Sequence, residues 1–221
     1  MKASIDDIVS KVRTAIDDIT KDADEEFTKD ADTEIKQAVV LAAMRVSKAA
    51  PLDMLEPVTA AGMIQTENKD GSGNIVVPKD YLCLVELRLK SWGRSIYTLM
   101  DSGSNEAAMQ ISMWSRGTAQ KPKAMLAHDS LGRRIIRYWS AGRKTQRQKD
   151  GRLKQVYDHA IDIFAYEPVP SINGDELKAG VTEECMSHII YMAAGIFLTG
   201  KKEDSLAAKC FQLAAFESDK K

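Results

Sequence analysis

Histidines are the first residues to consider for chemistry, because imidazole serves as a metal ligand and as a general acid or base near neutral pH. The chain contains three, His128, His159 and His188. None lies in an HExxH motif or at ligand spacing from a cysteine. No GxSxG elbow precedes a predicted helix, and no cysteine lies in a nucleophile signature. The residues therefore predict no metal, no cofactor and no nucleophilic catalysis.

Carboxylates are plentiful, but their placement favours a surface over a catalytic pair. Asp6 and Asp7, and then Asp17 and Asp18, fall on the expected outer face of one helix. Acid–base catalysis needs groups that converge in a cleft, and no such convergence is visible. The segment Gly71–Gly73 lacks the GK[ST] of a phosphate-binding loop and is typical of a turn. We expect a protein that is not an enzyme.

Composition limits the class of protein. The chain has 221 residues, of which 44% are hydrophobic and 29% charged, as in a soluble globular protein of one domain or one domain with appendages. No apolar run is long enough for a membrane span, and Met1–Val12 carries four charged groups, so we expect no secretory signal. Three cysteines without a CxxC pair argue against a disulfide scaffold or a zinc ribbon: Cys83, Cys185 and Cys210.

The net charge of -1 hides a strong segregation of charge along the chain. Residues 1–35 contain eleven Asp/Glu and five Lys/Arg. Residues 116–154 contain twelve Lys/Arg and only two acidic residues, Asp129 and Asp150. Charge separated in this way steers a molecule onto a partner or onto a copy of itself.

The basic segment also places cations beside aromatic rings. Arg133, Arg134 and Arg137 flank Tyr138 and Trp139, an arrangement in which arginine and aromatic side chains can stack on bases. Further cations follow in what we expect to be a polar loop: Arg143, Lys144, Arg147, Lys149, Arg152 and Lys154. Three interpretations stay open, namely a solvated strand face, contact with an acidic protein neighbour, and contact with nucleic acid phosphates.

Apolar spacing of three and four residues predicts helices at both ends of the chain. In the first helix the spacing gives a narrow stripe of Ile5, Ile8, Val12, Ile16 and Ile19 on an acidic rod. Because one helix cannot hide such a stripe alone, we expect it to dock on something. A second helix is predicted over 32–49, and a helical pair over 177–196 and 205–216.

The middle of the chain changes to strand patterns. Turn residues at 68–73 predict a hairpin joining the apolar runs near 63–65 and 75–77. Alternation predicts a strand at 85–89, a second hairpin over 123–139 and one further strand from about 155 to 166. A short helix is expected over 105–114.

These elements predict an α+β fold in which N- and C-terminal helices form a helical bundle with a central antiparallel β-rich insertion. The expected divisions are an acidic N-terminal helix and linker over 1–31 and a main domain over 32–221. Within that domain, helices at 32–57 and 175–217 surround the insertion at 62–168.

The loop 117–122 begins with Gly117 and ends with Pro122, which fix a rigid connection between the short helix and the next strand. The local conformational properties of this loop favour a role as a simple connection between the two elements. The alternative is that the loop presents Thr118 and Gln120 to a partner.

The order of these pieces from Asp32 onward resembles the adaptor, or head–tail connector, proteins of tailed bacteriophages. The nearest resemblance is to the ring proteins beneath the portal in short-tailed, crAss-like phages. It is carried by the strand entry Pro78–Leu82 with the later Ser91-Trp92, the loop Arg116–Pro122 and the strand end Asp162–Pro168. An alanine-rich C-terminal helical pair completes it.

The resemblance implies a structural virion protein, made in the host cytoplasm. It would form a homo-oligomeric ring in the head–tail connector, join the portal protein to other connector or tail rings, and extend the DNA channel. The alternative from the residues is a free nucleic-acid-binding module using the basic segment 116–154.

Two sets of contact residues follow from the charge pattern and the resemblance. The expected partner contacts are Ile5, Ile8, Val12, Ile16, Thr118 and Gln120. The expected contacts with channel DNA or a neighbouring subunit are Arg133, Arg134, Arg143, Lys144, Arg147 and Arg152.

Overall fold

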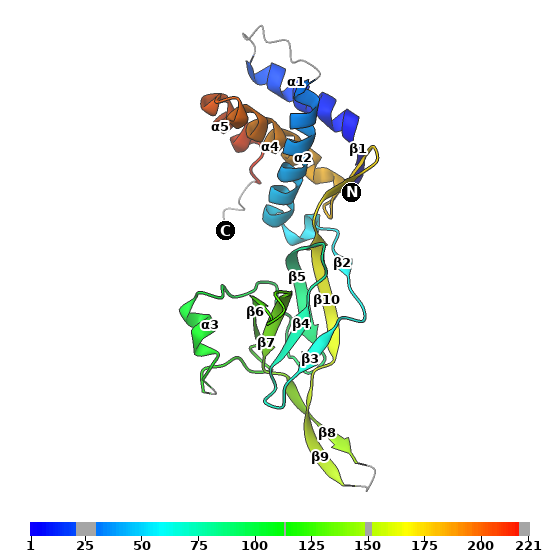
Figure 1. Cartoon of the computed structure of the whole chain (residues 1–221), viewed down its shortest axis with the longest axis vertical. Coiled ribbons are helices and arrows are strands. Elements are labelled where there is room, and N and C mark those ends of the chain that lie inside the picture. Colours follow the sequence, from blue (N-terminus) through cyan, green and yellow to red (C-terminus); the bar gives the residue numbers. More distant parts are fainter. Residues whose placement is uncertain (21–29, 113, 149–151, 217–221) are drawn as a thin grey trace. The chain divides into compact units, whose positions relative to one another are not determined.

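The chain divides into two compact units in the computed structural model, which describes residues 1–20, 30–112, 114–148 and 152–216. Unit 1 combines Met1–Pro57 with Glu167–Lys221, and unit 2 is Val58–Tyr166 (Figure 1). Each unit has its own hydrophobic core. One long segment is thus inserted between two sequence-distant parts of the first unit.

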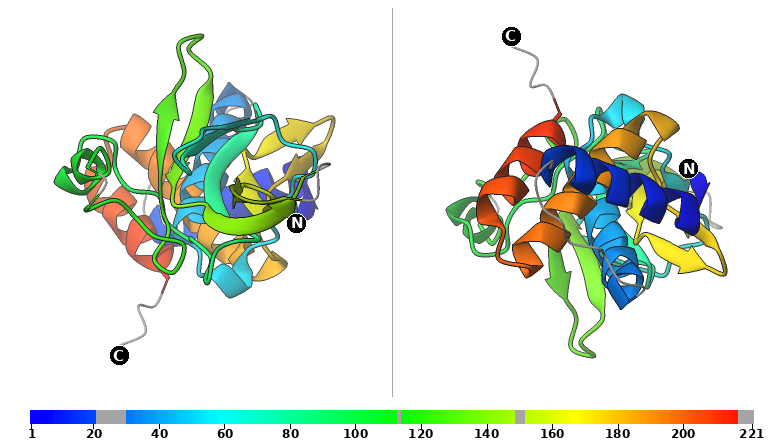
Figure 2. Two further views of the ribbon diagram at one scale, coloured as in Figure 1. Left: turned by 90° about the horizontal axis from the view of Figure 1, so that it is seen from below. Right: turned by 90° about the horizontal axis from the view of Figure 1, so that it is seen from above.

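Unit 1 contains four of the α-helices, packed on one core. They are α1 (Ile5–Thr20), α2 (Asp30–Ala49), α4 (Met186–Gly200) and α5 (Asp204–Leu213). Figure 2 shows α1 lying across α4 and α5 in the view from above. The spacing of the apolar residues in α1 places them on one face, and that face is almost fully buried against the other helices.

A small antiparallel sheet completes unit 1. Its order is β1 (Lys2–Ser4), β12 (Glu176–Lys178) and β11 (Ser171–Asn173), with 3₁₀ turns at Leu52–Met54 and Glu183–Cys185 elsewhere in the unit. Leu177 of the central strand pairs with Ala3 on one side and Ile172 on the other. Because Leu177 is fully buried among the helices, the sheet contributes to the same core.

Unit 2 is built from three small sheets and one short helix. The four-stranded sheet has the order β3 (Gln65–Glu67), β4 (Gly73–Val76), β7 (Arg134–Trp139) and β6 (Lys123–His128), all antiparallel. The three-stranded sheet has the order β2 (Val58–Thr59), β10 (Ile161–Pro168) and β5 (Tyr81–Leu89). Aromatic and aliphatic side chains of these two sheets form the core of the unit.

The remaining sheet of unit 2 is the hairpin of β8 (Gly142–Arg147) and β9 (Leu153–Asp158). It extends beyond the four-stranded sheet of the same unit (Figure 1). The helix α3 is Asn105–Met109, and its first turn is capped by the Ser104 hydroxyl, which accepts a hydrogen bond from the Ala107 amide at 3.1 Å.

The fold predicted from the sequence is wrong. The described residues form an α+β structure with five α-helices and twelve strands in four small sheets, rather than a bundle of N- and C-terminal helices with one β-rich insertion. Strands occur at both ends of the chain's first unit, where β1 pairs with β12. Three-residue strands carry no detectable alternation, so the helical periodicity beside them dominated the prediction.

Four element predictions are corrected in detail. The helix expected from residue 177 begins only at Met186, after β12 and the second 3₁₀ turn. The segment 143–154, expected to be a polar loop, forms most of the β8–β9 hairpin. The single strand expected over 155–166 is two strands, β9 and β10. The helix expected to reach Trp114 ends at Met109. The hairpins at 65–76 and 123–139 are confirmed, with the predicted turns between their strands.

Candidate contact surface

The β8–β9 hairpin is a cationic ribbon with little core of its own. Its strands pair Arg143 with Tyr157, Lys144 with Val156 and Arg147 with Leu153. Five of the six side chains of β8 are exposed, and Leu153 is 72% exposed. An isolated two-stranded ribbon is marginally stable in water, and this one is joined to the core of unit 2 by Tyr157, which packs against it.

Interactions near the base of the hairpin hold its cations in place. Arg143 lies 5.3 Å over the ring of Tyr157 and donates to its hydroxyl at 3.2 Å. On the opposite face, Lys144 donates to Asp158 at 2.8 Å, and this hydrogen bond lowers the pKa of the Asp158 carboxyl. Within the described residues, no carboxylate pairs with Arg147 or Lys154, so their charges face solvent.

A hollow of about 500 Å³ lies at the base of the hairpin. Its walls include Asp70, Arg116, Thr118, Arg143 and Tyr157. Arg116 donates to Asp70 at 3.1 Å. A hydrogen bond from the Ser72 hydroxyl, at 2.7 Å, is the main cause of the lowered pKa of Asp70, so this carboxylate stays charged and holds Arg116.

Two smaller hollows adjoin the one at the base of the hairpin. A hollow of about 380 Å³ shares Tyr157 with it and adds Lys69 and Lys154. A hollow of about 320 Å³ shares Arg116 and Thr118 with it and adds Lys121, among others. The three hollows, which share these lining residues, are here together called the cationic trough, and their walls carry six Lys/Arg and three Asp/Glu.

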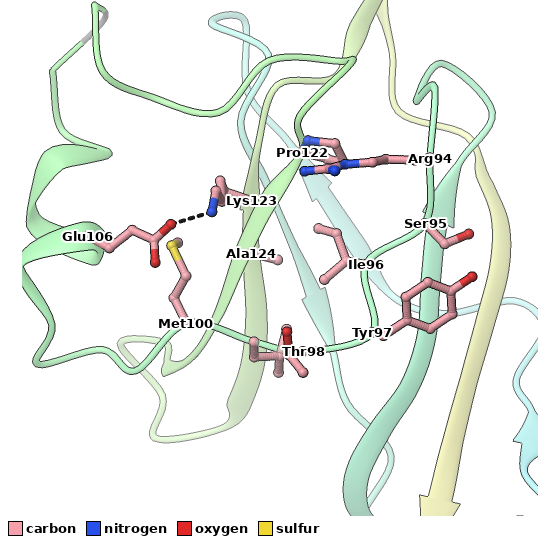
Figure 3. A pocket seen from close by; sticks show the side chains of 11 residues that line it. Arg94, Ser95, Ile96, Tyr97, Thr98, Met100, Glu106, Pro122, Lys123 and Ala124 are labelled. Atoms are coloured by element: carbon pink, nitrogen blue, oxygen red, sulfur yellow. Dashed lines mark hydrogen bonds and ion pairs between the residues drawn. The ribbon is translucent and has the colours of Figure 1, made fainter. Parts of the chain in front are cut away.

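A further hollow of about 440 Å³ lies between the segment after β5 and the start of β6 (Figure 3). The ion pair of Glu106 with Lys123 stands at one side, and Arg94 at another. Ile96 and Ala124 provide apolar wall.

The apolar stripe predicted to contact a partner lies inside unit 1. Ile5, Ile8, Val12 and Ile16 are at most 1% exposed and pack against the other helices of that unit. The stripe is the interior face of α1, so it offers no surface to a partner in this structure. The expectation that it must dock is met within the chain itself.

Arg133, which precedes β7, and Arg134, the first residue of β7, are engaged within unit 2. Arg133 donates to Asp129 at 2.7 Å, while Arg134 donates to the carbonyl of Tyr81 at 2.8 Å and lies 5.5 Å over its ring. Tyr138 is fully buried and Trp139 is 7% exposed, so neither ring is available to stack on a base. The expected pairing of arginine and aromatic side chains for base stacking is therefore absent at this strand.

Six of the predicted contact residues are exposed, as a contact role requires. They are Thr118, Gln120, Arg143, Lys144, Arg147 and Arg152. Thr118 lines two of the hollows of the trough, whereas Gln120 lies beside Gly93. The structure thus brings Thr118 and Arg143 to one hollow and leaves Arg133 outside it.

Sequence reasoning missed Asp70 and Tyr157 as parts of this surface. Asp70 was visible only as a turn residue, and Tyr157 only as part of a strand. Tyr157 pairs with Arg143 across the two strands of the hairpin. This pairing could be predicted only by someone who already knew the register of the hairpin.

Sequence reasoning also missed Glu167, which is fully buried in unit 1. Neither carboxyl oxygen has a hydrogen-bond partner within the described residues. Burial, opposed by the Met1 amino group and reinforced by Glu56, raises the pKa of Glu167 to about 7.

No protein-family model matches the sequence, and no curated protein matches it. The described residues contain no group of three or more His, Cys, Asp or Glu side chains placed to hold a metal ion. Among the helices that the structure describes, none is both long and apolar enough to cross a membrane.

Proposed function

We propose that this chain is a ring-forming structural subunit of a bacteriophage head–tail connector. It would join the portal protein to a following connector or tail ring and extend the DNA channel of the virion. The resemblance carried by the segments Pro78–Leu82, Arg116–Pro122 and Asp162–Pro168 supports this proposal. The role is assembly rather than catalysis.

The observation that carries the proposal is the exposed β8–β9 hairpin. It presents Arg143, Arg147 and Lys154 to solvent on a ribbon too small to be stable through its own packing. Such an arm is suited to lie against another subunit. A neighbour that covers it supplies the burial that the ribbon lacks, and the cations select an acidic surface.

A ring also needs two different faces that recognise each other head-to-tail. The acidic segment at the start of the sequence and the cationic hairpin provide unlike surfaces of opposite charge. Two cationic faces repel each other, so the pairing of like faces is disfavoured. Closure then follows from a constant rotation between successive copies.

Mass photometry and negative-stain imaging of the purified full chain, alone and with the portal protein of the same genome, test the proposal. We expect closed annular particles in at least one of the two preparations. A chain that stays monomeric in both, at every concentration examined, would contradict the proposal.

The exposed cations of the hairpin also favour a second candidate, a free nucleic-acid-binding module. That module would be monomeric and would bind duplex DNA with an affinity that falls steeply between about 50 and 200 mM salt. Fluorescence anisotropy with a labelled duplex at the two salt concentrations measures this. A monomer with steep salt dependence supports the module, and a ring with weak DNA binding supports the connector.

A further inference from the structure

The cationic trough of unit 2 includes the base of the β8–β9 hairpin, which contributes Arg143, Lys154 and Tyr157 to its walls. At its centre, Arg116 and Arg143 face one hollow of about 500 Å³. The hollow is large enough for several side chains. Thr118 and the hydroxyl of Tyr157 add hydrogen-bonding groups to the same wall.

The Arg143 guanidinium of this hollow retains capacity for an anion. It is exposed and makes a single weak bond, 3.2 Å long, to the Tyr157 hydroxyl. Carboxylates bind guanidinium groups in a bidentate manner, so this side chain is suited to receive one. Arg116, by contrast, is held by Asp70.

The sequence contains a segment with the complementary charge. Residues 17–32 carry eight Asp/Glu and two Lys, a net charge of six negative. The centre of this segment, residues 21–29, lies outside the described residues. Its net charge is opposite in sign to that of the trough, whose walls carry twice as many Lys/Arg as Asp/Glu, which favours docking by electrostatic complementarity.

We propose that the cationic trough of one copy receives the acidic segment 17–32 of a second copy. This inference rests on the proposed function, because it names the contact by which neighbouring subunits of the ring recognise each other. The segment and the trough belong to different units of the chain, so each copy carries both halves of a head-to-tail contact.

A charge-swap experiment on the full chain tests the contact. One variant carries Thr118→Glu, Lys121→Glu and Arg143→Glu, all at exposed positions, which changes the walls of the trough from six Lys/Arg and three Asp/Glu to four Lys/Arg and six Asp/Glu. The other carries Asp22→Lys, Asp24→Lys, Glu25→Lys and Glu26→Lys, which changes the segment from eight Asp/Glu and two Lys to four Asp/Glu and six Lys. Lys79→Glu, an exposed lysine of unit 2 outside the hollows, is the matched control. Circular dichroism confirms that each variant folds.

We expect each swapped variant alone to self-associate at least about tenfold more weakly than the unaltered chain in sedimentation velocity, and the control to be unchanged. An equimolar mixture of the two swapped variants restores association. In an alternating arrangement, each acidic trough meets a basic segment, and each native trough meets a native segment.

Three outcomes would overturn the inference. If the unaltered chain forms rings but the mixture of the two variants associates no more strongly than either variant alone, the contact between copies lies elsewhere. The proposed function then stands. If the trough variant alone differs from the unaltered chain, and the difference is a lower affinity for a DNA duplex, the occupant of the trough is nucleic acid. If the unaltered chain never associates, both the ring and this contact are excluded.

Discussion

At the scale of single residues, Glu167 links burial to a pH dependence of stability. Its carboxyl group is fully buried, without a hydrogen-bond partner among the described residues, and its pKa rises from an ordinary 4.5 to about 7. Between these two values the folded chain retains a proton that the unfolded chain has released. The free energy of unfolding therefore falls as the pH rises through this window.

We predict that Glu167→Gln removes this dependence. Above pH 7 the variant should be more stable than the unaltered chain by about 3 kcal/mol, while near pH 4.5 the two should agree closely. Urea unfolding followed by circular dichroism at a series of pH values measures the difference. Glu183→Gln, at an exposed position in the same unit, is the control. Parallel pH profiles for the Glu167 variant and the unaltered chain would show that the group is ionised when folded.

Gly73 is a second residue whose type is dictated by its surroundings. Tyr138 packs over it, with its hydroxyl accepting a hydrogen bond from Gln65 at 2.6 Å and lying 2.8 Å from Nδ1 of the buried His159. A Cβ atom at Gly73 would contact that hydroxyl and lie 2.8 Å from the carbonyl oxygen of Thr66.

We predict that Gly73→Ala destabilises unit 2 by about 1–3 kcal/mol, because the added methyl group displaces the Tyr138 hydroxyl from both partners. Thermal unfolding followed by tryptophan fluorescence reports the loss, since Trp92 packs edge-on against Tyr138. Gly103→Ala, where the nearest side-chain atom would be 3.9 Å away, should change the midpoint little. Equal effects at the two positions would contradict this account.

At the scale of elements, the sequence predicted helices and strands correctly where the same spacing of apolar residues continued over several helical turns or over neighbouring strands. The helices α1 and α2 and the hairpins β3–β4 and β6–β7 were predicted because repeated spacing or turn chemistry marks them. The β8–β9 hairpin was missed because nearly every residue of β8 is polar and exposed, which leaves no alternation to detect.

The candidate surface was predictable only in part. Charge counts located the basic segment, and exposure agrees with a contact role for Arg143 and Arg147. Long-range partners were invisible, because Asp70 and Arg116 are distant in sequence and meet only through the fold. The apolar stripe of α1 predicted the helix correctly but placed the stripe at a partner surface, whereas it lies inside unit 1. Periodicity cannot say whether an apolar face is covered by the same chain or by another.

We predict that Ile8→Ala, in this stripe, costs about 2–5 kcal/mol of unfolding free energy in the full chain at low concentration. Ile8 is fully buried against the helices of its own unit, so truncation leaves a cavity without any partner being present. Leu41→Ala in α2, where the leucine is 50% exposed, should cost much less. Chemical unfolding at two protein concentrations separates the interpretations. A cost that appears only at high concentration would place Ile8 in an interface.

At the scale of the whole molecule, the chain carries two cores with unlike surfaces. Unit 1 contains the acidic N-terminal segment, and unit 2 contains the cationic hairpin and trough. A net charge of -1 therefore conceals opposite charges that belong to separately packed parts. In the contact that we propose between copies, the two halves would come from different units.

The same division predicts that unit 2 folds without unit 1. The ends of the excised fragment 58–166 are neighbours, because Val58 pairs with Tyr166 across β2 and β10, and its core residues all lie within the fragment. We expect the fragment to unfold cooperatively and to show dispersed amide resonances. A fragment ending at residue 152, which lacks β9 and β10, is the control and should not fold. A featureless spectrum of 58–166 would show that its core depends on unit 1.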